Sequence, residues 1–471
     1  MGLVESGGHR PLPTSASYGI TVRLYALPSA SVVGELATAV GRAGGLVTAI
    51  DVTDSRTDRI TVDVSCSAVN GEHADEIVEA MRAVPAVTVH RVSDRTFLLH
   101  LGGKISVQPT VALKTRDDLS MAYTPGVGRV SLALAEHPED VPKLTIKGNA
   151  VAVVTDGSAV LGLGNLGPGA ALPVMEGKAA LFKRFADIDA WPICLDTQDT
   201  DEIVRVVQAI SPGFGGINLE DISAPRCFEI ERRLRETLSI PVFHDDQHGT
   251  AIVVSAALTN ALRCVSKPLA AARIVVAGGG AAGTAIVSLL IAAGAAHVLV
   301  WDREGILAPA DPRLNDAKRA LAQLTNPAGV TGDLHDALRG ADVFIGVSAP
   351  GVLDASWISE MAADPVVFAL ANPDPEVDVD AARQLAAVLA TGRSDYPNQI
   401  NNVLAFPGVF RGLLDARASQ VTTAMLLSAA DALAQCVSDE QLNATYIVPS
   451  VFDPAVPHAV AAAVREAAAN R

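Results

Sequence analysis

Apolar and polar side chains alternate along the first hundred residues, which is the pattern of half-buried strands. The segments YGITVRLYAL and GGLVTAIDVT flank a helix that we expect to begin near Ser31, and DRITVDVSC follows as a third strand. A second helix, at about residues 74–83, leads into VTVHRVSDRTFLLHL as the fourth strand. The order β-α-β-β-α-β predicts a ferredoxin-like unit over residues 18–101, preceded by a flexible tail over residues 1–17.

A different pattern begins after residue 101. Glycines and prolines punctuate residues 102–267, and polar side chains gather there at turns and strand ends, where sites are usually built. The run ARIVVAGGGAAGTAIVSLLIAAGAAHVLVWD then opens residues 268–471 with a continuous apolar strand, an alanine-rich helix and another strand. Hydrophobic residues make up 49% of the chain and charged residues 19%, which favours buried parallel strands over disorder. We therefore expect two further α/β domains, divided near residue 267.

The chain contains the pattern G-x-G-x-x-G twice, and its surroundings decide which copy binds a nucleotide. The copy in GGGAAG follows the apolar strand RIVVA and precedes a helix. The N–H groups at the start of that helix can therefore bind a pyrophosphate, and the glycines allow the backbone to approach it closely. Asp302 ends the next strand, where an acidic residue holds a ribose 2′-hydroxyl, whereas the adjacent Arg303 could attract a 2′-phosphate. We expect NAD to be preferred over NADP in a Rossmann-type domain. The expected contacts are Gly278, Gly280, Ala281, Ala282, Gly283, Asp302 and Arg303.

The other copy, GLGNLGPG at residues 162–169, lacks this context. It follows a turn and runs into Pro168 and Pro173, so we expect the next helix to begin near Val174 and no helix N-terminus to face these glycines. The segment is then a close-approach loop beside a helix that carries the sequence MEGK.

Charge and cysteine content exclude several classes of protein. The formal net charge is −16 and no cluster of lysine and arginine stands out, which argues against binding to nucleic acid or to an anionic membrane. Five cysteines are scattered without a C-x-x-C pair, so we expect reduced thiols and a cytoplasmic location. Neither a secretory signal nor a membrane span is expected.

Three acidic residues, Glu220, Asp221 and Asp246, are candidates for a metal site. Their carboxylate oxygens are hard ligands that suit Mg²⁺ or Mn²⁺, and no cysteine lies among them to favour zinc. Helix capping and solvated turns are the alternative interpretation for any one of these residues. His244 and His248, within HDDQHG, leave a histidine-rich site as another alternative.

Taken together, several segments resemble the malic enzymes of the compact bacterial type. They are, in chain order, AYTPGV, TDGSAVLGLGNLGPGAALPVMEGKAALFK, NLEDISAP, HDDQHGTA, FALANPDPE and NQINNVLAFPG, with YIVPSVFDPAVPHAVAAAV matching the terminal helix. The resemblance implies a substrate and metal domain over residues 102–267 and an NAD(P)-binding domain over residues 268–471. The first unit resembles an ACT domain through LPSASVVGELATAVGRAGGLVTAIDV. That second resemblance implies regulation by a small effector, or a structural role.

The malic enzyme resemblance implies oxidative decarboxylation of (S)-malate to pyruvate and CO₂, with reduction of NAD or NADP and a requirement for Mn²⁺ or Mg²⁺. Carried over by motif, Tyr123 is the general acid and Lys178 the general base. Glu220, Asp221 and Asp246 are the metal ligands, Asp245 supports the base, Asn372 and Asn402 hold substrate, and Asn401 lies near the nicotinamide. Larger relatives have an arginine for a substrate carboxylate where this chain has Ala159. A homodimer or a higher homo-oligomer is expected.

The chemistry requires each of these groups. Hydride leaves C2 of malate as its hydroxyl loses a proton, so Lys178 is expected to have a lowered pKa. Tyr123 suits protonation of the resulting enolate because a phenol is protonated at neutral pH. Two other functions remain open: a malolactic enzyme, which returns the hydride to form lactate, and an effector-binding regulator with a decayed catalytic site.

Overall fold

The computed structural model describes residues 15–470 of the 471-residue chain. The chain divides into two compact units, the first ending at Ser106 and the second beginning at Val107. Residues 1–14 of the expected tail lie outside the described residues, and residues 15–17 form the start of the first strand.

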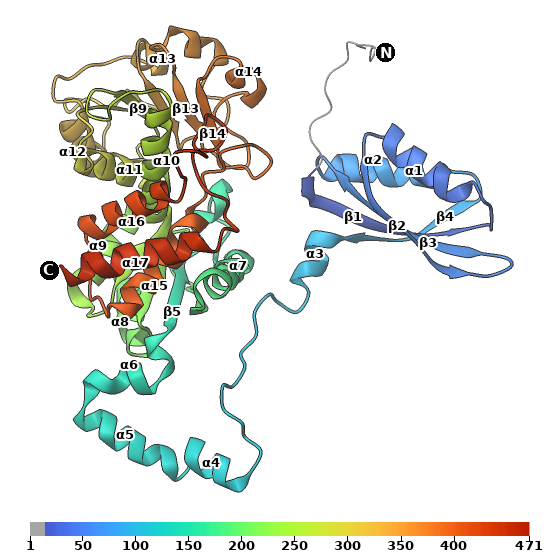
Figure 1. The fold of residues 1–471 in the computed structure, drawn as a ribbon, viewed down its shortest axis with the longest axis horizontal. Coiled ribbons are helices and arrows are strands. Elements are labelled where there is room, and N and C mark those ends of the chain that lie inside the picture. The colour runs from blue at the N-terminus through green and yellow to red at the C-terminus, as the bar shows by residue number, and fades with distance from the viewer. Residues whose placement is uncertain (1–14, 471) are drawn as a thin grey trace. The chain divides into compact units, whose positions relative to one another are not determined.

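The first unit is a four-stranded antiparallel sheet covered on one face by two helices (Figure 1). The strand order β2-β3-β1-β4 is that of a ferredoxin-like fold, which confirms the predicted element order. Inward-facing side chains of β1 and β3 pack on α1 and α2, and Val22, Val62 and Leu36 belong to the buried core that results. The elements are β1 (Ser15–Ala26), α1 (Val32–Arg42), β2 (Leu46–Ser55), β3 (Ile60–Ala68), α2 (Gly71–Arg82) and β4 (Val87–Asp94).

The fourth strand is shorter than the sequence pattern predicts. It ends at Asp94, and residues 95–100 form the helix α3 (Arg95–His100) in place of more strand. The Asp94 carboxylate accepts hydrogen bonds from the backbone N–H groups of Thr96 and Phe97, at 2.7 and 3.1 Å. An N-terminal cap of this kind outweighs the strand propensity of an apolar run.

The second unit begins with two helices, α4 (Arg116–Ala122) and α5 (Gly126–Glu136), and then builds a parallel sheet of order β6-β5-β7-β8. The strands are buried: all six residues of β5 and all four of β7 are covered. The elements after α5 are α6 (Val141–Leu144), β5 (Ala150–Thr155), α7 (Pro168–Ala186), β6 (Asp189–Cys194), α8 (Thr200–Ile210), β7 (Gly216–Leu219), α9 (Arg226–Thr237), β8 (Val242–His244) and α10 (Thr250–Cys264).

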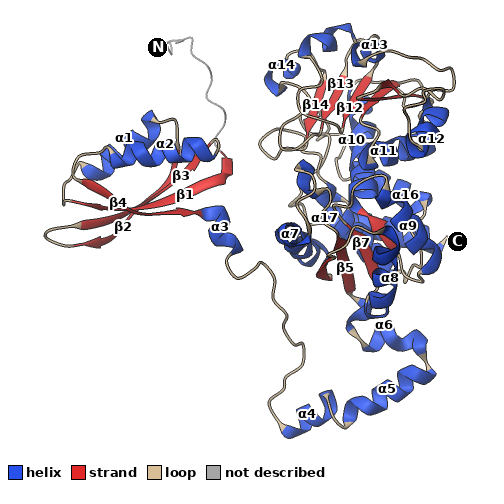
Figure 2. Ribbon diagram, turned by 180° about the vertical axis from the view of Figure 1, so that it is seen from behind, coloured by secondary structure: helices blue, strands red, loops and turns tan. Residues whose placement is uncertain are grey.

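A second sheet follows, of order β11-β10-β9-β12-β13-β14, and it is parallel except for β11. Figure 2 shows β12, β13 and β14 of this sheet. This is the doubly wound arrangement expected of a Rossmann-type domain. Its elements are β9 (Arg273–Ala277), α11 (Ala281–Ala292), β10 (His297–Asp302), β11 (Gly305–Ile306), α12 (Asp316–Thr325), α13 (Leu334–Leu338), β12 (Val343–Gly346), β13 (Val366–Ala369), α14 (Val379–Arg383) and β14 (Val388–Thr391).

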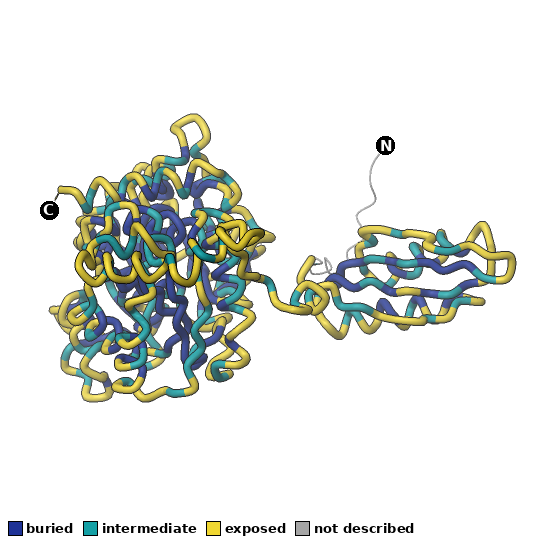
Figure 3. Tube along the Cα trace, turned by 90° about the horizontal axis from the view of Figure 1, so that it is seen from below, coloured by how far each residue is buried: buried dark blue, intermediate teal, exposed yellow. Residues whose placement is uncertain are grey.

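The chain then returns to the lobe that contains the β6-β5-β7-β8 sheet. Helices α15 (Phe406–Asp415), α16 (Thr423–Gln435) and α17 (Ala455–Ala469) pack against one another and against α7 and α10. Phe406 and Phe410 of α15 place their rings 4.7 and 5.2 Å from that of Phe182 on α7, and all three rings are fully buried. A single hydrophobic core thus includes residues of both sheets and of α10, visible as the buried interior in Figure 3.

Two further expectations can be compared with the fold. No helix among residues 15–470 is long and apolar enough to cross a membrane. All five cysteines are free thiols, at positions 66, 194, 227, 264 and 436.

Candidate active site

Three carboxylates meet where the strands of the β6-β5-β7-β8 sheet end. Glu220 and Asp221 directly follow β7, and Asp246 lies in a π-helical turn, Asp245–Gly249, directly after β8. Ligand oxygens of the three side chains lie within 4.8 Å of one another. Parallel strands bring their carboxyl ends to one edge of a sheet, so residues 25 positions apart in the chain form one cluster. We call Glu220, Asp221 and Asp246 the acid cluster.

The environment of the acid cluster suits a divalent cation. Burial raises the pKa of all three carboxyl groups, and repulsion from Asp246 raises those of Glu220 and Asp221 further, the latter to about 8. Asp221 also adopts a left-handed backbone conformation, with φ at 54°, and its buried Oδ2 has no hydrogen-bond partner among the described residues. Strain and an unpartnered buried oxygen are features of ligand sites, and hard oxygen donors of this kind fit Mg²⁺ or Mn²⁺.

Lys178 lies beside the acid cluster. It projects from the middle of α7, is only 7% exposed, and places its Nζ 2.5 Å from Asp245 Oδ2 and 2.9 Å from Glu220 Oε1. Burial lowers the pKa of Lys178, but the two carboxylates raise it by more, so the net shift is upward. This direction is opposite to the expected lowering, because two carboxylates lie against the ammonium group in this arrangement.

Asp245 connects Lys178 to a residue predicted to hold substrate. Its carboxylate is fully buried and also accepts a hydrogen bond from Asn402 Nδ2. A Cβ atom on Gly249 would lie 2.0 Å from Asp245 Oδ1, so the π-helical turn leaves room for this carboxylate only when position 249 is glycine. Asn401, one residue earlier, accepts a hydrogen bond from the backbone N–H of Val403 and so caps a short turn.

The loop after β5 differs from its prediction. Helix α7 begins at Pro168, six residues before the expected start at Val174, so a helix N-terminus does follow the glycines of GLGNLGPG. Proline is compatible with the first position of a helix because that N–H would be unpaired in any case. Gly162 also makes the close approach that was expected, since a Cβ atom there would lie 2.9 Å from the carbonyl oxygen of Asn372.

Tyr123 is the one predicted catalytic residue that the chain does not bring to Lys178. It stands at the corner between α4 and α5 and is 67% exposed. Figures 1 and 2 show both helices beyond α6, at the end of the unit where β5 begins. The acid cluster, by contrast, lies at the carboxyl ends of the strands.

The nucleotide-binding pattern has the geometry that its function requires. Gly280 caps α11, and Gly283 packs so tightly that a Cβ atom would lie 1.8 Å from the carbonyl oxygen of Gly278. Gly278 itself has φ at +124°, which favours glycine. Asp302 accepts a hydrogen bond from the backbone N–H of Gly279 at 3.1 Å, so its carboxylate faces the glycine turn. The Arg303 side chain is exposed.

We expect Gly283→Ala to weaken NAD binding and to lower thermal stability, because the new methyl group would push the first turn of α11 away from Gly278. Overpacking of this kind costs about 1–3 kcal/mol. Gly280→Ala is the matched control for stability, because a Cβ atom at Gly280 meets no atom within 4 Å. Thermal unfolding and NAD titration of both variants make the comparison. Equal stability of the two variants would contradict the tight packing at Gly283.

Several side chains at the site were missed by the sequence interpretation. Asn218 is fully buried and donates from Nδ2 to Glu220 Oε2 at 2.9 Å. Its place near the end of β7, two residues before Glu220, was the available signal. Lys318 pairs with Asp302 at 2.9 Å, which no local pattern indicates. Within the described residues, the metal-binding group contains no histidine: His248 contacts Glu231 at 2.6 Å, and burial lowers the pKa of His244 to about 4.

Known proteins resemble this chain over most of its length. The profile of the malic enzyme N-terminal domain matches residues 102–235, and that of the malic enzyme NAD binding domain matches residues 247–469. An NAD-dependent malic enzyme of Geobacillus stearothermophilus is 54% identical over 457 residues, covering 97% of this chain and 96% of its own. A bifunctional malic/malolactic enzyme of Bacillus subtilis is 51% identical over 368 residues, which are 78% of this chain and 90% of its own. The crystal structure of an NAD-dependent malic enzyme from Thermotoga maritima has a TM-score of 0.76 at 51% identity, covering 79% of this chain and 99% of its own.

Proposed function

Because the chain belongs to the malic enzyme family, we propose that it catalyses the oxidative decarboxylation of (S)-malate to pyruvate and CO₂ with reduction of NAD. The observation that carries the proposal is the buried contact of Lys178 with Asp245 and Glu220, directly beside three carboxylates. A base, a divalent-cation site and a nucleotide-binding fold are the parts that this reaction needs. The test is NADH formation from malate with and without Mn²⁺.

The residues divide the reaction between them. Lys178 would take the proton of the C2 hydroxyl as hydride leaves for the nicotinamide, once a cation on the neighbouring acid cluster offsets the carboxylates that raise the pKa of this lysine. Asp245 and Asn402 would hold the base and the substrate in place. A divalent cation held by Glu220, Asp221 and Asp246 would supply Lewis acidity to the substrate oxygens and neutralise the acid cluster. Tyr123 returns a proton to C3 after CO₂ has left. Asn372 and Asn401 complete the proposed contacts with substrate and nicotinamide.

We expect a higher kcat/KM with NAD than with NADP, by about tenfold or more, which corresponds to roughly 1.4 kcal/mol. Asp302 faces the glycine turn, and its pKa is lowered, against the effect of burial, by hydrogen bonds from Lys318 and from backbone N–H groups. It is therefore ionised and opposes a 2′-phosphate. Steady-state kinetics with both cofactors give the ratio of kcat/KM with NAD to kcat/KM with NADP. Asp302→Ala should lower this ratio. A higher kcat/KM with NADP would refute the assignment.

A malolactic activity is the second candidate function, because the Bacillus subtilis relative is named as a bifunctional malic/malolactic enzyme. The two outcomes differ in the fate of the hydride. NADH and pyruvate accumulate together in the malic reaction, whereas lactate forms without net NADH in the other. Product analysis by NMR after complete consumption of malate separates them.

We also propose that the first unit is an ACT domain that binds a small effector. It holds a cavity of about 910 Å³ against α1 and α2, lined in part by Ser31, Glu35 and Arg42. Removal of residues 1–101 is expected to leave turnover intact and to abolish any effector response, since the match to the malic enzyme domains begins at residue 102. The test is to measure the kinetics of the full chain and of the truncated chain with candidate amino acids and organic acids as effectors. If the full and truncated chains respond equally to every effector, the first unit is not the sensor.

The free thiols support a cytoplasmic location, since disulfides are rare in that compartment. The net charge of −16 leaves nucleic acid and anionic membranes as poor partners.

A further inference from the structure

The π-helical turn, Asp245–Gly249, supplies two of the carboxylates in the proposed site. The backbone N–H of Thr250 donates to the carbonyl oxygen of Asp245, five residues back, where an α-helix would use a carbonyl four residues back. Each residue of an α-helix turns the chain by about 100°. Loss of the extra residue would therefore swing Asp245 and Asp246 by about that angle, away from Lys178 and the acid cluster.

Asp246 depends on this turn for its position. Within residues 15–470 its carboxylate accepts one hydrogen bond, from the backbone N–H of Asp221 at 3.0 Å. The fully buried ring of His244 places Nδ1 3.8 Å from Asp246 Oδ2, which is beyond hydrogen-bond distance. The direction of the Asp246 side chain is therefore set largely by the backbone of the turn.

A buried glutamate on α9 contacts the two residues that follow Asp246. Glu231 is 5% exposed; its Oε1 lies 2.6 Å from His248 Nε2, and its Oε2 lies 3.2 Å from Gln247 Nε2. Carboxylate oxygens accept, so both hydrogen bonds are donated by side chains of the turn. Arg235, one helical turn further along α9, lies 3.8 Å from the same Oε1. One carboxylate thus holds two successive residues of the turn.

The other glutamates of α9 have no partner in the turn, and they lie at the surface. The side chains of Glu229 and Glu236 are 47% and 58% exposed, and both pair with Arg232. A buried carboxylate costs free energy unless it is paired, and an apolar side chain would pack α9 against its neighbours without that cost. Packing alone therefore does not explain a glutamate at position 231, whereas a need to hold the turn does.

We propose that Glu231 is a positioning residue for the metal site and for the base. It holds Gln247 and His248 and so keeps the turn in its π-helical form. The turn in that form keeps Asp246 in the acid cluster and Asp245 against the base. Within the described residues Glu231 makes no hydrogen bond to the acid cluster, so it acts through the turn. The proposal rests on the proposed function, because it assigns Glu231 to the same divalent-cation site.

The test is the binding of Mn²⁺ to Glu231→Gln, measured by electron paramagnetic resonance of free Mn²⁺. Glutamine keeps the shape of glutamate, but its amide nitrogen cannot accept, so one of the two donors of the turn loses its partner. We expect the dissociation constant for Mn²⁺ to rise by about 10- to 100-fold, the loss typical of residues that orient metal ligands. An unchanged dissociation constant would overturn the proposal, even if thermal stability falls.

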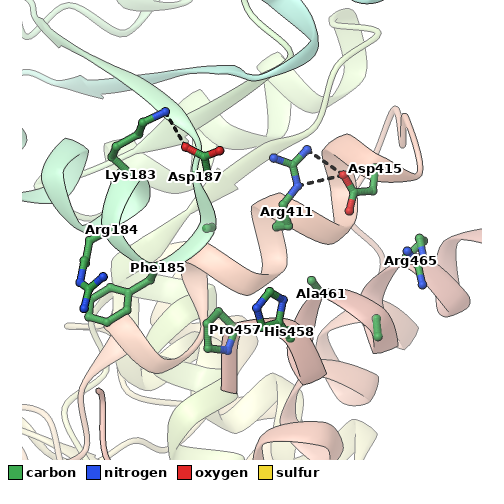
Figure 4. A pocket seen from close by; sticks show the side chains of 12 residues that line it. Lys183, Arg184, Phe185, Asp187, Arg411, Asp415, Pro457, His458, Ala461 and Arg465 are labelled. Carbon is green, nitrogen blue, oxygen red and sulfur yellow. Dashed lines mark hydrogen bonds and ion pairs between the residues drawn. The ribbon is translucent and has the colours of Figure 1, made fainter. Parts of the chain in front are cut away.

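An ion pair elsewhere in the second unit supplies the matched control. Figure 4 shows Asp415 paired with Arg411 at 2.7 Å, beside a cavity of about 680 Å³ lined by residues of α7, α15 and α17. Asp415→Asn makes the same change from carboxylate to amide at a cation contact, and it should leave the dissociation constant for Mn²⁺ unchanged. An equal rise in Asp415→Asn and Glu231→Gln would overturn the proposal, because the effect would not be specific to the turn.

A second variant breaks the same contact from the side of the turn. His248→Ala removes the shorter hydrogen bond and leaves α9 unchanged, so it should also weaken Mn²⁺ binding. If the two residues act as one unit, the double variant binds Mn²⁺ no more weakly than the weaker single variant, whereas independent effects multiply. Multiplied effects would overturn the proposal. His248→Ala also provides the measurement if Glu231→Gln does not fold, and unchanged Mn²⁺ binding by His248→Ala would then overturn it.

Failure of the proposed function gives a different result. A wild-type protein that binds Mn²⁺ without turning over malate would show that the proposed function is wrong, and the comparison of Mn²⁺ binding would still decide the role of Glu231. A wild-type protein that binds no Mn²⁺ would overturn both.

Discussion

Replacing Lys178 by alanine is expected to lower kcat for NADH formation by about 10²- to 10⁴-fold, the range that a positioned base contributes. The Lys178 side chain is buried, and its Nζ lies within 3 Å of both Asp245 and Glu220. A water molecule or a buffer base therefore cannot easily reach the same position and replace the lysine. The measurement is steady-state kinetics with saturating malate, NAD and Mn²⁺. Lys183→Ala is the matched control, since Lys183 lies on the same helix with its side chain 56% exposed.

The step that fails separates Lys178 from Tyr123. Tyr123→Phe keeps the ring and removes its only transferable proton, so we expect this variant to fail in exchanging the methyl hydrogens of pyruvate with deuterated solvent. Lys178→Ala is expected to be most defective in the steps that move the hydride. Methyl deuteration followed by NMR, with Mn²⁺ and NADH present, compares the variants. Exchange at the wild-type rate by Tyr123→Phe would assign the acid to another residue.

Replacing Asp246 by asparagine is expected to raise the Mn²⁺ concentration needed for half-maximal activity sharply. The increase should exceed the roughly 10- to 100-fold that loss of an outer-shell partner costs, because a charged ligand is lost. The shape of the side chain is kept, and the asparagine carbonyl can still accept the hydrogen bond that Asp246 Oδ2 receives from the backbone N–H of Asp221 at 3.0 Å. The fold should therefore persist.

Direct binding of Mn²⁺ provides a measurement independent of turnover. Electron paramagnetic resonance of free Mn²⁺ during titration should show weaker binding to Asp246→Asn. Asp201→Asn is the control, since it removes one charge from an exposed carboxylate on α8 without touching the acid cluster. Identical titrations for Asp246→Asn and wild type would remove Asp246 from the ligand set.

Sequence predicts the parts of the fold in which the local pattern of apolar residues matches the residues that the structure buries. The strand RIVVA, the glycine turn and the alanine-rich helix carry their signal within about twenty residues, and the structure places β9, the turn and α11 there. Glu220, Asp221 and Asp246 were predicted as a metal site from the chemistry of their carboxylates and from the malic enzyme resemblance. The structure brings them together because carboxylates that follow buried parallel strands share an edge of the sheet.

Other features of the site depend on contacts between residues, many of them far apart in the sequence, and a local pattern does not predict them. Pro168 reads as a helix breaker, yet at the first position of α7 it fits, which moved the helix start by six residues. The pKa of Lys178 depends on Asp245, 67 residues away, and on Glu220, so no local pattern gives its direction. Tyr123 stands at the exposed corner between α4 and α5, and no local sequence pattern indicates that it lies apart from Lys178.

The packing of α15 against α7 has a consequence for synthesis on the ribosome. Phe182 on α7 is covered by Phe406 and Phe410, which leave the ribosome more than two hundred residues later. At elongation rates of roughly 5–20 residues per second, the nascent chain carries this uncovered ring for about 10–45 seconds. The strands of the nucleotide-binding sheet, from Arg273 to Thr391, all emerge within that interval. They can therefore pair before α15 covers Phe182. A chain that stops short of α15 would therefore hold its sheets but expose the aromatic core beneath α7, which makes it a substrate for chaperones and proteases instead of a smaller enzyme.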